Sequence, residues 1–352
     1  MRGINRPSDL YEEALQKLKN EVKMNGCKAT IEKFDRYSVR EYLQEETHLS
    51  SEAIRMMGDL LNENSIMSKS VLEMIYLENG INDTVNYSEV TGGTDLIPNG
   101  LYRTLKKDTV IFNAPVKKIS QKNNKVTVWY QDKKTQSLSN LIADAALVTT
   151  TAKAALFIDF DPPLSPSKME ALRLVRYASS TKVILTFSEK FWEKEGIHGG
   201  KSITDRPSRF IYYPSHSFPG NDKIGVLLAS YTWAEDSILL TSLSDDNLKE
   251  IALKDLELIH GDQVRSLCTG VYVKKWTLDP HSHDAFSFFT PYQLSEYAKV
   301  IFKNEGRIYF AGEHTDLPHA WMESSVKSAI KAARNITDAL KALDADMARD
   351  EL

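Results

Sequence analysis

The segment near the C-terminus constrains this chain most, because a short apolar strand ends there in glycine and leads into a helix. The apolar run at 309–311 precedes Gly312 and Glu313, and a long helix rich in small residues is expected from about residue 321 to residue 343. A glycine at the end of a strand allows close backbone approach to a ligand, and the carboxylate after it suits the vicinal hydroxyls of a ribose or ribityl chain. The first turn of the helix suits a pyrophosphate. An ordinary strand–helix unit, whose glycine only fills a turn, gives the same pattern.

The first part of the chain has the pattern of helices. One helix is expected to stop at Gly26. Ser38 stands three residues before Glu41, which is the spacing of a capping box. Ser50 or Ser51 is expected to begin a third helix, with apolar residues at helical spacing behind it.

After residue 93 the period changes to short runs rich in β-branched and aromatic residues, which predict strands. A helix at 246–258 interrupts them, and the strand–helix unit described above follows. Strand-rich blocks that are separated along the chain in this way indicate interleaved domains. The expected strands are 109–112, 116–119, 126–130, 145–149, 182–187, 225–231, 272–276, 286–289 and 307–312.

Composition excludes several classes of function. The net charge of −4 gives no electrostatic footprint for nucleic acid. No apolar run reaches the roughly 18 residues that a membrane-spanning helix requires. Two cysteines are too few for a disulfide framework, and no metal site is predicted.

Several short signals bear on localisation. The N-terminus carries no apolar core of a signal peptide. Sequons place candidate glycosylation sites at Asn82, Asn86 and Asn335. The last four residues, 349–352, read RDEL and resemble the ER-retrieval tetrapeptide with arginine replacing lysine, although a charged helix end gives the same letters. Together the sequons and the tetrapeptide predict that a full-length parent enters the secretory pathway, in the ER lumen, a lysosome or outside the cell.

The segment at 309–325 resembles the C-terminal flavin signature of the L-amino-acid oxidase and monoamine oxidase superfamily. The resemblance extends across nearly the whole chain. The sequence is more similar to the animal L-amino-acid oxidases (snake-venom, fish and interleukin-induced immune enzymes) than to monoamine or polyamine oxidases. Separate blocks carry the resemblance, at 36–38, 41–43, 58–63, 92–98, 199–202 and 205–214.

The resemblance implies an α+β fold with a helical domain, a mixed-sheet substrate domain and a partial FAD-binding domain lacking its N-terminal βαβ unit. It also implies a homodimer. The domains it implies are a helical domain at 1–87, part of the FAD-binding domain at 88–174, a substrate-binding domain at 175–301, a returning FAD-binding strand and helix at 302–345, and a tail at 346–352.

The activity that the resemblance implies is FAD-dependent oxidative deamination of L-amino acids to 2-oxo acids, with oxygen consumed and ammonia and hydrogen peroxide released. Lys182 matches a lysine that holds a water near flavin N5, and Tyr292 matches a tyrosine that binds the substrate carboxylate. Ala320 and Trp321 match positions that line both substrate and cofactor. The cofactor-binding positions are Val116, Gly312, Glu313, Ala320, Trp321, Met322, Glu323, Ser324 and Ser325.

This sequence departs from the family pattern in several places. Many relatives have glycine where Ala320 stands, and Leu77 aligns with a mobile active-site histidine of the venom enzymes. No G-x-G-x-x-G motif occurs in the chain, and the arginine that clamps the substrate carboxylate and the usual partner of Cys27 lie upstream of its start in the family. We therefore expect an N-terminally truncated chain that by itself neither holds FAD tightly nor oxidises amino acids. A monoamine or polyamine oxidase and a catalytically inactive homologue remain the alternatives.

Overall fold

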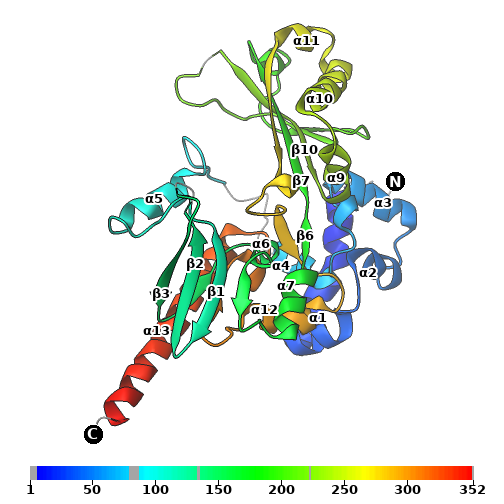
Figure 1. Ribbon diagram of the computed structural model, residues 1–352. Helices are drawn as coiled ribbons and strands as arrows, with labels where there is room; N and C mark the ends of the chain where they lie inside the picture. The colour runs from blue at the N-terminus through cyan, green and yellow to red at the C-terminus, as the bar shows by residue number, and fades with distance from the viewer. Residues whose placement is uncertain (1–5, 79–86, 133–134, 222, 351–352) are drawn as a thin grey trace.

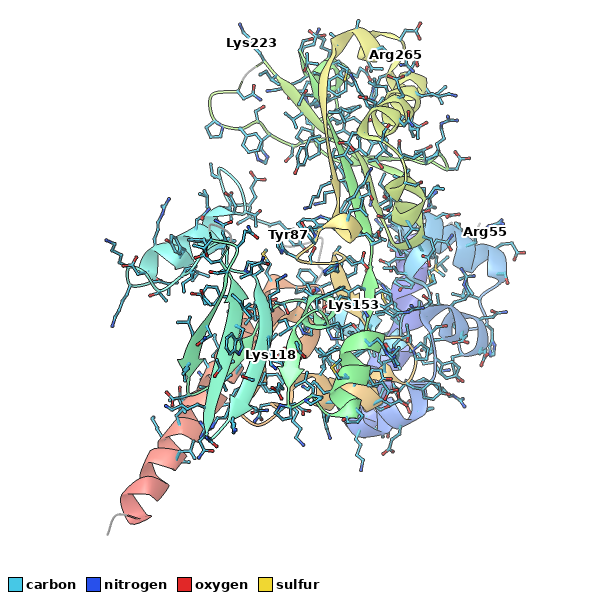
Figure 2. All side chains as sticks on the ribbon, viewed as in Figure 1. Arg55, Tyr87, Lys118, Lys153, Lys223 and Arg265 are labelled. Carbon is cyan, nitrogen blue, oxygen red and sulfur yellow. The ribbon has the colours of Figure 1, made fainter. Side chains whose placement is uncertain are left out.

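A computed structural model describes residues 6–78, 87–132, 135–221 and 223–350. Helices of the N-terminal region lie on one side of the molecule and a three-stranded antiparallel meander on the other (Figure 1). A larger sheet with its covering helices extends away from both, and the C-terminal helix runs behind the meander (Figure 1). Arg265 marks the far end of the larger sheet layer, and Lys118 lies on the meander (Figure 2).

The N-terminal helices follow their local signals. The Ser38 hydroxyl accepts a hydrogen bond from the Glu41 backbone N–H, and the Glu41 carboxylate accepts one from the Ser38 backbone N–H, so the predicted capping box is confirmed. Gly26 is non-helical (φ 78°, ψ 166°), so the first helix ends there as predicted and a second helical segment follows it within the range given for α1. The elements are α1 (Pro7–Phe34), α2 (Val39–Glu45), α3 (Ser51–Leu61, capped by Ser50), the 3-10 turn η1 (Asn64–Ile66) and α4 (Val71–Glu78).

The expected strand at 109–112 is wrong. These residues are exposed and pair with no other strand, because four β-prone residues without a neighbour to receive their backbone groups cannot form a sheet. An unpredicted helix, α5 (Leu96–Thr104), precedes them and buries none of its residues. The meander itself is confirmed, with Asn123 and Asn124 both at positive φ in its two-residue turn. Its sheet has the order β3 (Leu138–Ala143), β2 (Lys125–Gln131), β1 (Val116–Lys122) and β5 (Asp159–Asp161).

The larger sheet is antiparallel and has one covered face. Residues alternate in burial along β7, so that Val183, Leu185 and Phe187 enter a core whereas Lys182 and Ile184 line the other face. Helix α10 (Asp245–His260) covers the first face through Leu248 and other apolar residues. The strand order is β11 (Cys268–Lys275), β7 (Ser180–Phe187), β10 (Gly225–Trp233), β9 (Phe210–Tyr212) and β8 (Lys201–Ile203), with α8 (Phe191–Lys194), α9 (Ala234–Thr241) and α11 (Gln263–Leu267) at its margins.

Short strands from distant parts of the chain complete the fold. Strand β13 (Ile308–Phe310) pairs in parallel with β4 (Ala146–Val148), and β12 (Phe286–Phe288) pairs antiparallel with β6 (Arg176–Ala178). Both pairs bring C-terminal segments against earlier ones, as the interleaved pattern predicted. The remaining elements are α6 (Ala152–Ala155), α7 (Pro166–Leu174), the turn η2 (Trp276–Leu278), α12 (Gln293–Phe302), the turn η3 (Glu313–Thr315) and α13 (Met322–Asp350).

The apolar residues form two separate cores. One core joins the N-terminal helices to the meander and to β13, through residues such as Leu15, Ile119 and Phe310. The second lies wholly between the larger sheet and its helices, around Trp192 and Leu227. The predicted division into domains remains a prediction, and no helix in the described part of the chain is long and apolar enough to cross a membrane.

Candidate functional site

The loop between β13 and α13 has the backbone geometry that its sequence predicted. Gly312 has φ 144°, in the region that favours glycine, and its N–H donates to Ser328 Oγ at 2.9 Å. A Cβ at this position would lie 2.7 Å from the ring of His314. The loop therefore requires glycine here, whether or not a ligand is present.

Glu313 ties this loop to strand β12. Its carboxylate accepts the Ser287 N–H at 3.2 Å, the Ser287 hydroxyl at 2.8 Å and the Ala320 N–H at 2.8 Å. A carboxylate has about four lone-pair sites, so three bonds leave capacity for a ligand hydroxyl. Glu313 can thus hold the loop closed and also serve a vicinal diol.

The turn before α13 carries the other predicted positions. Ala320 is exposed and has φ 68°, and Trp321 is half-buried. Helix α13 begins directly after them, so its first N–H groups have no partner within the helix and are available to an anion. The predicted positions differ in exposure: Met322 and Glu323 are exposed and Ser325 is half-buried, whereas Ser324 is buried and donates its hydroxyl to the Pro318 carbonyl.

Sequence reasoning missed a charged pair behind this turn. His319 Nδ1 lies 2.8 Å from Glu73 Oε1, and both side chains are only 2% exposed. Burial lowers the pKa of the neighbouring His314 to about 3, and the charges of His319 and Lys168 act in the same direction. His314 is therefore neutral at ordinary pH.

Lys182, which the resemblance matched to a lysine near the flavin, lies on the open face of the larger sheet. It lines a cavity of about 340 Å³ together with Tyr212 and Leu228. Its ammonium is 4.7 Å from the centre of the Tyr231 ring, and burial lowers its pKa. No carboxylate among the described residues forms an ion pair with it, so its Nζ keeps donors for a ligand or a water molecule.

A row of aromatic rings connects Lys182 to the loop. Ring centres of Tyr231 and Trp233 are 5.1 Å apart, and those of Trp233 and Phe286 are 6.5 Å apart. Phe286 immediately precedes the serine that binds Glu313. Alternate aromatic residues on β10 were the available signal for this row, and the sequence prediction did not use it.

Two predicted residues lie elsewhere. Tyr292 is the N-cap residue of α12, and its backbone N–H donates to the Asp35 carbonyl at 2.7 Å. Tyr292 is 57% exposed, and no contact in the described part of the chain joins its side chain to Lys182 or Glu313. Val116 begins β1 in the meander, whose sheet meets the β13 region through Gln121.

The candidate glycosylation sites are only partly visible. Asn335 is exposed on α13. Asn82 and Asn86 fall outside the described residues. Cys27 and Cys268 are both free thiols.

Residues 9–337 match the family model of flavin containing amine oxidoreductases. The chain is 60% identical over 327 residues to an L-amino-acid oxidase of Siganus canaliculatus, an alignment that covers 93% of this chain and 62% of that protein. It is 43% identical over 332 residues to an L-amino-acid oxidase of Pseudechis australis, covering 94% and 63%. The chain thus spans less than two thirds of the length of either relative.

Solved structures agree at the level of the fold. An engineered putrescine oxidase matches with a TM-score of 0.79 at 17% identity, covering 96% of this chain and 77% of that one. A cyclohexylamine oxidase from Brevibacterium oxydans matches with a TM-score of 0.73 at 17% identity, covering 94% and 75%. The α+β architecture expected from the sequence is the one these enzymes have.

Proposed function

Because this chain belongs to the family of flavin-containing amine oxidoreductases, we propose that its protein oxidises L-amino acids with FAD as cofactor. The reaction converts an L-amino acid, oxygen and water to a 2-oxo acid, ammonia and hydrogen peroxide. The observation that carries the proposal is the continuous series of contacts from Lys182 to Glu313, in a chain 60% identical to an L-amino-acid oxidase.

The residues present fit the cofactor. The Glu313 carboxylate keeps lone pairs for the ribityl or ribose hydroxyls, and the first turn of α13 offers N–H groups to the diphosphate. The same loop offers backbone at Gly312 and Ala320 and an aromatic side chain at Trp321. When bound, FAD would accept a hydride from the substrate α-carbon and pass the electrons to oxygen.

The protein's own groups bind and orient the substrate. Lys182 Nζ has three donors and no carboxylate partner among the described residues, so we assign it to a water molecule at the reacting face. Tyr231 lies beside Lys182 on the same open face, so we propose that its hydroxyl, together with that of Tyr292, binds the substrate carboxylate. Trp233 and Phe286 extend the wall against which an apolar substrate side chain packs.

The test measures flavin and peroxide separately. The gene product at its full length is purified, its flavin absorbance is recorded, and peroxide release is assayed with L-phenylalanine and L-leucine. Tyramine and putrescine serve as matched amines without a carboxylate. We expect bound FAD and peroxide from the amino acids alone. Peroxide from the amines but not from the amino acids would assign the protein to the amine oxidases, and bound FAD without turnover of either would leave an inactive homologue.

We also propose the secretory route and a homodimer for the full protein. Support for the first comes from the sequon at Asn335, whose side chain is exposed. Glycosidase treatment of the protein from its natural source tests for the glycan by a shift in mass, and light scattering measures the mass of the assembly.

A further inference from the structure

One ion pair links the N-terminal helices to the loop that precedes α13. Glu73 lies on α4 and His319 lies 246 positions later, yet their side chains meet at 2.8 Å and both are buried. The Phe289 N–H donates to the same Glu73 oxygen at 3.3 Å, and the Phe289 ring packs edge-on against His319 at 4.5 Å. The histidine is thus held from two sides.

The surroundings of the ring favour a charged His319. His319 Nδ1 lies 2.8 Å from Glu73 Oε1, and both the Glu73 carboxylate and the His314 backbone stabilise the protonated imidazole. Burial alone would lower the pKa of His319, but the Glu73 carboxylate, helped by Glu313, outweighs it and raises the pKa above 6.5.

The position of His319 gives the pair its consequence. It directly precedes Ala320, whose φ of 68° is a left-handed conformation that is unfavourable for a non-glycine residue. The Ala320 N–H is bound by Glu313 at 2.8 Å. Two carboxylates therefore fix this turn, one through the histidine before it and one at the alanine itself.

We propose that Glu73 is a positioning residue for the Ala320–Trp321 turn. Through the His319 ring it holds the turn in its left-handed conformation and thereby presents Trp321 to the flavin and substrate. Only this last step rests on the proposed function, because the clamp itself is a property of the protein alone. The N-terminal helices thus influence the conformation of the turn through the contact of Glu73 with His319.

The first experiment is hydrogen–deuterium exchange of the peptide covering 313–322, without added flavin. Glu73→Gln keeps the shape of the side chain and leaves the imidazolium without its counter-charge. We expect exchange in this peptide to rise about tenfold or more. The matched control is Glu63→Gln, which breaks a partly buried ion pair of the same helical region, that of Glu63 with Lys69 at 2.7 Å. It should leave the loop as protected as in the wild type.

A neutral pair and the wild type provide two further readouts. Glu73→Gln combined with His319→Gln should regain part of the protection, since no charge is left uncompensated. In the wild type, a pKa raised in the folded state means that protection is present at low pH and lost as pH rises through that pKa. Exchange rates corrected for intrinsic base catalysis test this even where the variants fail to fold. Loop protection that is unchanged in Glu73→Gln, or independent of pH in the wild type, overturns the proposal.

A flavin arm separates this inference from the proposed function. FAD affinity, measured by quenching of flavin fluorescence, should fall about tenfold more in Glu73→Gln than in Glu63→Gln. These measurements use the full-length protein, and a full-length wild type that binds no FAD but shows the clamp in exchange contradicts the proposed function alone. Equal FAD affinity in the two variants, in a wild type that does bind FAD, contradicts the positioning role.

Discussion

Lys168 offers a measurable consequence of burial in the core that supports the loop. The side chain on α7 is fully buried, and its ammonium donates to the carbonyls of Ile301 at 2.9 Å and Lys303 at 2.5 Å. It also lies 4.1 Å from the centre of the Phe310 ring in β13. Burial lowers its pKa from 10.5 to about 7, against the attraction of Glu305.

The sign and size of the effect follow from proton linkage. Above pH 7 the folded state releases the Lys168 proton while the unfolded chain still holds it, so the free energy of unfolding rises with pH. With values of about 7 folded and 10.5 unfolded, integration from about pH 7 to about pH 9 gives a gain of about 2 kcal/mol. Replacing Lys168 by methionine removes this contribution.

Urea denaturation at the two pH values measures it. The wild type should gain about 2 kcal/mol more than Lys168→Met on going to the higher pH. Lys254→Met, at an exposed position of α10, is the control and should follow the wild type. If Lys168→Met gains as much stability as the wild type, Lys168 keeps its proton in the folded state and the reasoning fails.

Three further predictions use other contacts. Trp233→Phe removes the hydrogen bond from the indole to the Asn62 carbonyl at 2.8 Å, and should lower the free energy of unfolding by about 1 kcal/mol in urea; no change would mean that the bond contributes nothing. Tyr231→Phe should lower kcat/KM for L-phenylalanine about tenfold or more while FAD affinity is kept. If kcat/KM falls only in Tyr292→Phe, the substrate carboxylate is bound by Tyr292 and not by Tyr231. Ser38→Ala removes a helix cap and should lower the free energy of unfolding by about 1 kcal/mol, measured as a lower midpoint of thermal unfolding. A midpoint equal to that of the wild type would contradict this prediction.

The parts of the fold that sequence predicted are those with a local physical cause. The capping box at Ser38 and the two-residue turn at Asn123 and Asn124 depend on a few adjacent residues, and both are present. The strand expected at 109–112 had the right residue types but no partner, and pairing is not a local property. The whole of α5 was missed because Pro98 and Gly100 within it disfavour a helix, although its exposed apolar residues stand at helical spacing.

The site divides in the same way. Gly312 and Glu313 stand next to each other, and their order alone pointed to a ligand loop. Glu73 and His319 are 246 positions apart, and Lys182 reaches Glu313 only through rings on β10 and β12. Such contacts are made by tertiary packing, which no pattern within one window of sequence reports. The roles assigned to single residues remain predictions.

The two separate cores have a consequence for how such a protein can evolve. The chain passes from the first core to the second between β6 and β7, where the buried Ser179 shares hydrogen bonds with the hydroxyls of Ser237 and Thr277. Each core closes on itself, so a substitution within the larger sheet is absorbed by its own neighbours. The larger sheet can therefore change with little effect on the packing of the first core. A lineage can alter what its open face recognises while the loop around Glu313 keeps its inherited form.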